Sequence, residues 1–283
     1  MFCIFPYVSQ RCVLRKIHRD PWYDLGDILG EQFRGIRSSR YSQSAIDRCV
    51  HASFRENADT YTKKNPAIFG RVNVILRAMQ QCGCHAERAQ TVLEIGSGHG
   101  NGIPALRAAF PNAWMIASDL SPEMLCRLRT SSMHDRRVIP VHMDAEELSF
   151  QPASFDFIMG WGVLHHLFTP RRTVERCRSI LKPQGCALFA EPLAEGHAII
   201  VEAYRRILMH ERSLELPEEL QRHYSMRVFH FPRQIMEEKV LPVFEHMDDK
   251  WYFRQKYFQD IGKELGFRLC TMMKICRMGV AAN

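Results

Sequence analysis

Residues 91–102 read TVLEIGSGHGNG, a short apolar run that leads into a stretch where four glycines alternate with other residues. A run of this length and composition predicts a buried β-strand. Glycines let the backbone turn sharply and approach a ligand, and the N-terminus of a following helix offers unpaired N–H groups. The stretch therefore predicts a strand, a ligand-binding loop and the start of a helix.

Four further apolar runs of similar length follow along the chain, at residues 114–119, 138–144, 155–160 and 186–192. Amphipathic segments at 101–110, 122–130 and 170–181 lie between them, and Ser121 with Pro122 forms a helix start signal for the second. Strands that alternate with helices indicate βαβ units. We expect an α/β fold, a Rossmann-like, mostly parallel, twisted sheet with helices on both faces.

The ligand site of such a sheet lies beyond the carboxyl ends of its strands. In this sequence the five runs end at Gly96, Asp119, Asp144, Gly160 and Glu191. Asp119 follows the second run, where an acid can accept hydrogen bonds from a ribose diol. These positions predict one nucleotide-type site.

Five motifs resemble those of the class I S-adenosylmethionine-dependent methyltransferases, in the small-molecule, ubiquinone-biosynthesis-like branch. They are VLEIGSGHG (92–100), ASDLSPEML (117–125), HMDAEELSF (142–150), FDFIMGWGVLHHL (155–167) and RSILKPQGCALFAEP (178–192). The resemblance covers about 100 residues, 91–192. Gln184 replaces a usual glycine of the family in the last motif, and we expect this replacement to be harmless.

The resemblance implies S-adenosylmethionine as cofactor and a role for each matching residue. It places Glu94 and the glycine loop at the amino-acid end of the cofactor, Asp119 at the ribose and Leu120 at the adenine. Asp144 would reach the adenine amino group with Ala145 beside it, and Gly160 and Trp161 would lie beneath the methionine portion. Tyr61 would close over the cofactor from a lid helix. The implied cofactor-binding set is Tyr61, Glu94, Gly96, Ser97, Gly98, Gly100, Asp119, Leu120, Asp144, Ala145, Gly160 and Trp161.

The candidates for acid–base chemistry are His165 and His166 after the fourth strand and Glu191 at the end of the fifth. Methyl transfer from a sulfonium depends mainly on aligning the acceptor with the methyl group, and a base helps only when the acceptor must lose a proton. A histidine with an ordinary pKa can accept such a proton near neutral pH. His99, within the glycine loop, is expected to face solvent.

The predicted organisation has four parts. Residues 1–60 form an N-terminal arm with a helical segment, and 61–192 form the cofactor-binding core. Residues 193–258 form a helical substrate cap inserted after the fifth strand, whose aromatic residues either contact an apolar acceptor or pack the cap's own core. Residues 259–283 complete a C-terminal helix and add a strand, although the family normally ends with two antiparallel strands.

The composition limits which classes of binding partner are expected. Lys and Arg exceed Asp and Glu by seven, but the excess is diffuse, so nucleic acid is not indicated. No apolar stretch is long enough for a membrane span. The ten cysteines include no Cys-x-x-Cys pair, so no metal site is predicted; we read them as reduced thiols of a cytoplasmic protein.

We expect methyl transfer to an oxygen, nitrogen or carbon atom of a small metabolite, in secondary or cofactor metabolism. The alternatives are a protein or RNA methyltransferase, and a non-catalytic S-adenosylmethionine-binding regulator or partner subunit. A nicotinamide oxidoreductase is disfavoured because Asn101 stands where its glycine fingerprint requires the third glycine. Both a monomer and a homodimer are compatible with the pattern.

Overall fold

A seven-stranded sheet organises the computed structural model, which describes residues 13, 22–49, 62–63, 70–83, 85–210 and 249–267. The strand order is β1-β2-β5-β4-β3-β6-β7; β1 runs antiparallel to β2, and all other neighbouring pairs are parallel. The five predicted strands are β3 (Thr91–Ile95), β4 (Trp114–Asp119), β5 (Val138–His142), β6 (Phe155–Trp161) and β7 (Leu181–Ala190). The predicted fold class is confirmed.

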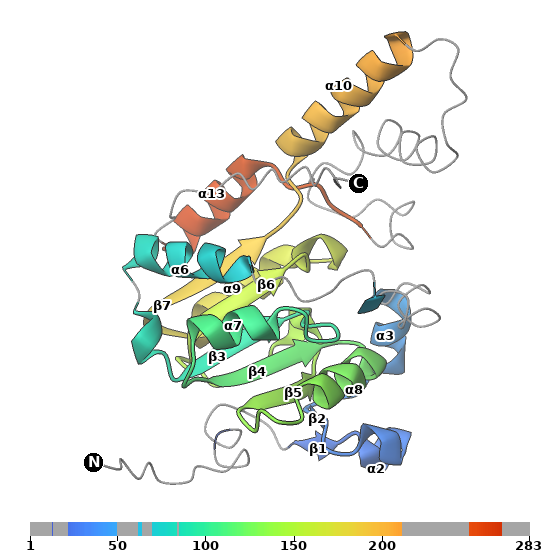
Figure 1. Cartoon of the computed structure of the whole chain (residues 1–283), viewed down its shortest axis with the longest axis vertical. Helices are drawn as coiled ribbons and strands as arrows, with labels where there is room; N and C mark the ends of the chain where they lie inside the picture. Colours follow the sequence, from blue (N-terminus) through green and yellow to red (C-terminus); the bar gives the residue numbers. More distant parts are fainter. Residues whose placement is uncertain are drawn as a thin grey trace.

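Helices cover both faces of the sheet because its strands are apolar on both sides. Side chains alternate along β3, where Val92 packs with one core cluster and Leu93 with the other. On the face of Val92 lie α6 (Arg71–Cys82), α7 (Ile103–Ala109) and α8 (Pro122–Ser131). On the face of Leu93 lie α9 (Pro170–Ile180) and α13 (Gln255–Glu264) (Figure 1). The expected start of α8 is confirmed, since Ser121 Oγ accepts a hydrogen bond from Met124 N at 3.3 Å.

The N-terminal region adds two strands that the sequence pattern did not predict. These are β1 (Tyr23–Asp24) and β2 (Arg37–Ser38), separated by α2 (Gly26–Leu29) and the short 3₁₀ helix η1 (Glu31–Phe33). β2 pairs in parallel with the end of β5, so Ser38 lies opposite His142. β1 and β2 therefore extend the edge of the sheet beside β5. The segment ends in α3 (Gln43–Cys49).

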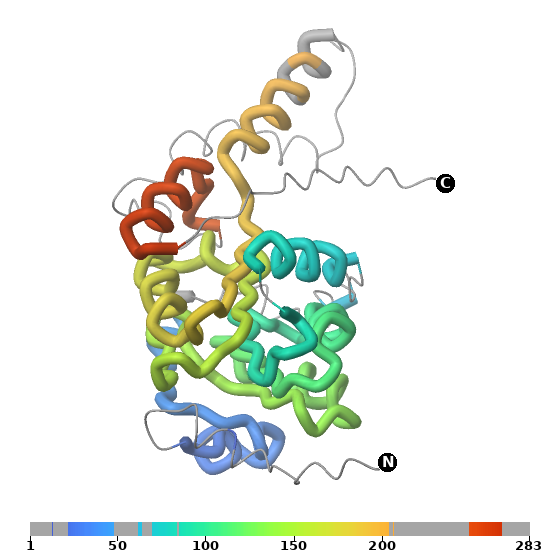
Figure 2. The backbone as a smooth tube through the Cα atoms, turned by 90° about the vertical axis from the view of Figure 1, so that its left-hand side faces the viewer, coloured from blue at the N-terminus to red at the C-terminus, as the bar shows by residue number. Residues whose placement is uncertain are grey.

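The remaining elements lie beyond the strands' carboxyl ends or connect them. They are η2 (Ala86–Arg88), η3 (Ala145–Glu147), η4 (Leu164–His166) and α10 (Ala194–His210). β1, β2 and α2 lie at one end of the molecule, and α10 projects from the opposite end (Figures 1 and 2). No helix within the described ranges has both the length and the apolar character needed to cross a bilayer.

Two sequence expectations fall outside the described residues. These are the cap helix over 217–224 with Phe229 to Phe231, and the strand predicted after α13, of which only the first residues precede the end of the described chain at 267. The later aromatic group is described: Trp251, Tyr252 and Phe253 are all buried, and Trp251 and Phe253 pack in the core with Ile261 of α13. Trp251 and Phe253 thus pack in the core on one face of the sheet, and Tyr252 packs against Ala194 and Val201 of α10.

Candidate functional site

The glycine loop joins β3 to α7 and holds a backbone that side chains would strain. Gly96, Gly98 and Gly100 have φ values of 67°, 54° and 91°. A Cβ atom on Gly96 would stand 2.7 Å from Val163 Cγ2, whereas no protein atom lies within 4 Å of a Cβ built on Gly98. The loop is therefore packed on one side and open beside Gly98, where a ligand can approach the backbone.

Asp119 lies at the end of β4 and is tied to this loop. Its Oδ2 accepts a 2.7 Å hydrogen bond from Gly98 N, and its Oδ1 accepts a 2.8 Å hydrogen bond from Ser121 N. Burial raises the pKa of the carboxyl, while these backbone donors oppose the shift. Each oxygen retains a lone pair, so the fixed carboxylate can accept further hydrogen bonds from a diol.

Glu94 is a buried acid beneath the start of α7. Its side chain is enclosed at 3% residue exposure, and Oε2 has no hydrogen-bond partner in the described part of the chain. Burial raises the pKa of Glu94 to about 8, and the charge of Arg71 opposes the shift. A buried polar atom without a partner is costly in an empty protein, which makes this carboxyl a candidate ligand contact.

Arg71, at the first position of α6, belongs to the same region and was not predicted. Its Nη1 donates a 3.3 Å hydrogen bond to Asn101 Oδ1, and its guanidinium lies 4.4 Å from the centre of the Trp161 ring. Residue 71 precedes Ile75 by one helical turn and thus shares the buried face of the helix. This spacing from Ile75 could have identified Arg71 from the sequence, because an arginine on the buried face of a helix needs a partner for its charge.

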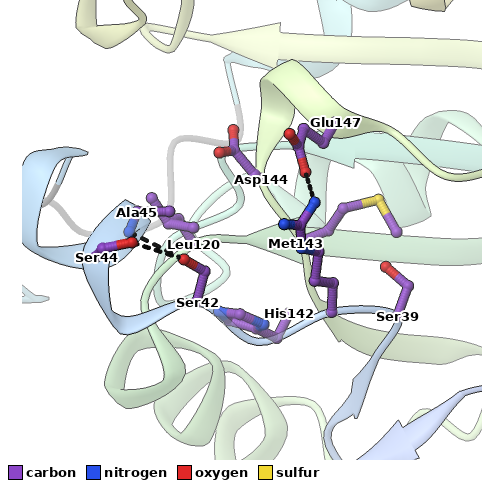
Figure 3. A pocket seen from close by; sticks show the side chains of 10 residues that line it. Ser39, Ser42, Ser44, Ala45, Leu120, His142, Met143, Asp144 and Glu147 are labelled. Carbon is purple, nitrogen blue, oxygen red and sulfur yellow. Dashed lines mark hydrogen bonds and ion pairs between the residues drawn. The ribbon is translucent and has the colours of Figure 1, made fainter.

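A pocket of about 180 Å³ lies on the other side of Asp119, between β5 and the N-terminal segment. Leu120 and Asp144 line it as the resemblance implies, together with residues 39–45 in part (Figure 3). Asp144 Oδ1 accepts a 2.8 Å hydrogen bond from Glu146 N, which fixes its carboxyl at the start of η3. Arg40 and Glu147 form an ion pair of 3.2 Å on the wall of the pocket.

Ala145 lies next to this pocket, where its carbonyl oxygen accepts a 3.0 Å hydrogen bond from Thr173 Oγ1. Gly160 lies on β6, where a Cβ atom would collide with Phe189 at 2.6 Å. Ser97 is buried, and its Oγ has no hydrogen-bond partner among the described atoms. Tyr61 lies outside the described residues. His99 is buried at 9% exposure, so the expectation that it faces solvent is wrong.

The second half of the site is η4, which Glu191 holds in place. Glu191 Oε1 accepts hydrogen bonds from Val163 N at 3.0 Å and Leu164 N at 2.9 Å. Its Oε2 is 2.6 Å from His165 Nδ1 and also accepts a hydrogen bond from the His165 backbone. With both oxygens engaged and the side chain 1% exposed, Glu191 is built to position His165.

Asp249, which the sequence did not predict, forms a cluster with the two histidines. Its Oδ1 lies 3.3 Å from His165 Nε2 and 3.7 Å from His166 Nδ1. Burial alone would lower the pKa of His165, but hydrogen bonds with Asp249 and Glu191 raise it to about 9. His165 therefore differs from a histidine with an ordinary pKa, because it carries its proton at neutral pH.

Comparison with known proteins finds similarity to methyltransferases. A family model described as a methyltransferase domain matches residues 92–185. The demethylmenaquinone methyltransferase of Clavibacter sepedonicus is 28% identical over 142 residues, which cover 50% of this chain and 57% of that protein. The ubiquinone biosynthesis O-methyltransferase of Xanthomonas euvesicatoria pv. vesicatoria is 30% identical over 159 residues, covering 53% and 61%.

Two further matches agree. The malonyl-[acyl-carrier protein] O-methyltransferase of Laribacter hongkongensis is 30% identical over 149 residues, covering 50% of this chain and 49% of that protein. The crystal structure of the CurJ carbon methyltransferase superposes with a TM-score of 0.51 at 15% identity, covering 82% of this chain and 62% of that one. The chain thus spans about half to three fifths of these three curated relatives, and residues 92–185 match the methyltransferase domain family.

Proposed function

We propose that this chain transfers a methyl group from S-adenosylmethionine to an oxygen, nitrogen or carbon atom of a small metabolite. The observation that carries the proposal is the open glycine loop with Asp119 and the buried carboxyl of Glu94 near it, whose Oε2 has no hydrogen-bond partner among the described residues. A ribose diol and an amino-acid end are the two groups that such a pair of acids accommodates. The matched relatives are named for demethylmenaquinone, malonyl-[acyl-carrier protein] and ubiquinone biosynthesis. These names support a small-molecule acceptor.

The residues present fit the cofactor at both of its ends. Leu120 and Asp144 line the pocket next to Asp119, where an adenine ring would stack and donate from its amino group. At the opposite end, Glu94 would accept a hydrogen bond from the cofactor's ammonium group, and Ser97 Oγ is a further buried atom in need of a partner. Arg71 supplies the positive charge that a carboxylate requires.

The other proposed contacts follow from position. Gly96, Gly98 and Gly100 bring backbone close to the ligand without side chains. Gly160 and Trp161 would lie beneath the methionine portion, and Ala145 beside the adenine. Tyr61 is proposed to close over the cofactor as a lid contact.

The acceptor side of the site is η4. S-adenosylmethionine supplies a methyl group on a positively charged sulfur, which is already activated for transfer. The task of the protein is to hold the acceptor atom in line with that methyl group. We assign this to His165 and His166, with Glu191 positioning His165 rather than touching the acceptor.

Calorimetric titration with S-adenosylmethionine, S-adenosylhomocysteine and NADH tests the proposal. Both sulfur compounds should bind and NADH should not. Asp119→Ala should weaken binding about ten- to a hundredfold, equivalent to ~1.5–3 kcal/mol for hydrogen bonds to a charged group. Asp260→Ala is the matched control, because Asp260 is an exposed acid that pairs with Lys256 on the surface of α13.

Two outcomes would overturn the proposal. A folded chain that binds neither sulfur compound has no cofactor site, and a chain whose affinity is unchanged by Asp119→Ala binds elsewhere. Formation of S-adenosylhomocysteine with a panel of hydroxylated and acyl acceptors then separates a transferase from a protein that only binds the cofactor.

A further inference from the structure

The cluster of His165, His166 and Asp249 has the composition of a metal site. One ring nitrogen from each histidine and one carboxylate oxygen lie within 4.8 Å of one another. Two imidazoles and a carboxylate are ligands that zinc and iron(II) accept in catalytic sites, where three protein ligands leave room for a further one. The sequence predicted no metal site, because the cysteines have no ligand spacing. His165, His166 and Asp249 come together only in the fold.

Two of the three spacings between the ligand atoms approach those around a bound ion, and the third, between the two ring nitrogens, lies within 4.8 Å and would close on binding. Zinc lies about 2.0–2.2 Å from nitrogen and oxygen ligands, so neighbouring ligand atoms stand about 3–3.5 Å apart. The 3.3 Å between His165 Nε2 and Asp249 Oδ1 is within this range. The 3.7 Å between His166 Nδ1 and Asp249 Oδ1 requires a shift of a few tenths of an ångström.

Two hydrogen bonds to backbone carbonyls hold the segment of Asp249 opposite η4. Lys250 N donates to His165 O at 2.8 Å, and Trp251 Nε1 donates to Leu167 O at 2.6 Å. Both Lys250 and Trp251 are buried. Asp249 therefore reaches the histidines from a segment bound on both sides of His166, which is how a preorganised site is built.

Glu191 supplies the outer shell that metal-binding histidines usually have. A histidine that binds a metal through one ring nitrogen commonly donates the other N–H to a carboxylate, which fixes the tautomer. Here the 2.6 Å contact of His165 Nδ1 with Glu191 Oε2 orients Nε2 towards Asp249. Glu191 is itself anchored by the backbone of η4, so the whole arrangement is rigid.

We infer that His165 Nε2, His166 Nδ1 and Asp249 Oδ1 bind a divalent transition-metal ion of the zinc class, with Glu191 as the outer-shell partner of His165. Because η4 begins just after Val163, whose side chain packs on the glycine loop, the ion would lie beside the cofactor pocket. Its open coordination positions would take an oxygen atom of the acceptor. This last step rests on the proposed function, whereas binding of the ion does not.

A bound cation would also define the acceptor chemically. It favours the deprotonated form of a hydroxyl or enol oxygen and holds it in a fixed direction. The proton leaves to solvent when the oxygen binds, the new bond forms between that oxygen and the methyl carbon, and the sulfur retains the electron pair of the broken bond. The acceptor class is thus an ionisable oxygen compound.

The test is titration of ZnCl₂ into the chelator-treated full chain by calorimetry, without cofactor or acceptor. One ion per chain is expected. His166→Gln and Asp249→Asn should each weaken binding at least tenfold, and Glu191→Gln, which changes only the outer shell, should weaken it about 10- to 100-fold. Co²⁺ should give visible absorption bands that these variants reduce.

His85→Gln is the matched control, because His85 forms an exposed 3.2 Å pair with Glu87 that lacks a second histidine. It should bind zinc as the unmodified chain does. Circular dichroism of each variant confirms that the fold is intact. Absence of binding by the folded chain, or binding that the cluster variants leave unchanged, overturns the inference. Since no cofactor is present, neither result depends on whether S-adenosylmethionine binds.

Discussion

The Oε1 atom of Glu94 fills the space where a Cβ atom on Gly102 would stand. Gly102 precedes α7 with an ordinary backbone conformation, at φ −83°. The glycine is therefore required by this close approach and not by a turn.

Gly102→Ala should destabilise the chain and displace Glu94. Overpacking in a buried region typically costs about 1–3 kcal/mol, and the displaced carboxyl should also weaken S-adenosylmethionine binding. Gly196→Ala, within α10 where a Cβ atom meets nothing within 4 Å, should stabilise the chain by about 0.5–1 kcal/mol. Chemical unfolding and calorimetry measure both effects. Equal stabilities for the two variants would contradict the packing described here.

Glu94 should give the ligand-free chain a characteristic pH dependence. Its pKa is about 8 in the folded protein and close to 4.5 when unfolded, so the folded state binds more protons between these values. The stability contributed by the protonated carboxyl is complete below pH 4.5 and is lost as the pH rises towards 8, at up to about 1.4 kcal/mol per pH unit. Glu94→Gln should remove this part of the slope, while the exposed Glu202→Gln should retain it. Unfolding curves at several pH values check the prediction, which fails if Glu94→Gln and the unmodified chain have parallel profiles.

Arg71 should recognise the amino-acid end of the cofactor selectively. Arg71→Gln removes the charge, so affinity for S-adenosylmethionine should fall about tenfold or more. Affinity for 5′-methylthioadenosine, which lacks the amino-acid group, should be unchanged. Arg206→Gln, at an exposed position on α10, is the control for loss of a surface charge. If Arg71→Gln weakens both ligands equally, the residue supports the fold instead of contacting the carboxylate.

Gln184 occupies a strained backbone position. Its φ is 68°, a conformation that costs an L-residue roughly 1–2 kcal/mol relative to the right-handed region. Gln184→Gly should relieve the strain, partly offset by the greater freedom of glycine when unfolded, for a net gain of up to about 1 kcal/mol. Gln90→Gly, at a residue without positive φ, should lower stability, and thermal unfolding distinguishes the two.

The sequence was sufficient for the central sheet because each of its five strands is a short apolar run and amphipathic helices follow β3, β4 and β6. It also placed Asp119, Asp144 and Leu120 beside one another, since parallel strands carry their ends to one edge. It could not supply β1 and β2, because two-residue strands have no periodicity to detect. Asp249 could not be predicted either, because it lies 3.3 Å from His165 in the fold but 84 positions after it in the sequence.

The pairing of β2 with β5 has a consequence for how the chain is made. Ser38 Oγ and His142 Nδ1 are 2.9 Å apart in the folded protein but separated by 104 positions in sequence. During synthesis, the segment that forms one wall of the Leu120 and Asp144 pocket leaves the ribosome well before the strand it must pair with. Closing so long a loop is slow compared with forming the local βαβ units. The wall of this pocket that residues 39–45 contribute is therefore completed only after β5 has been made.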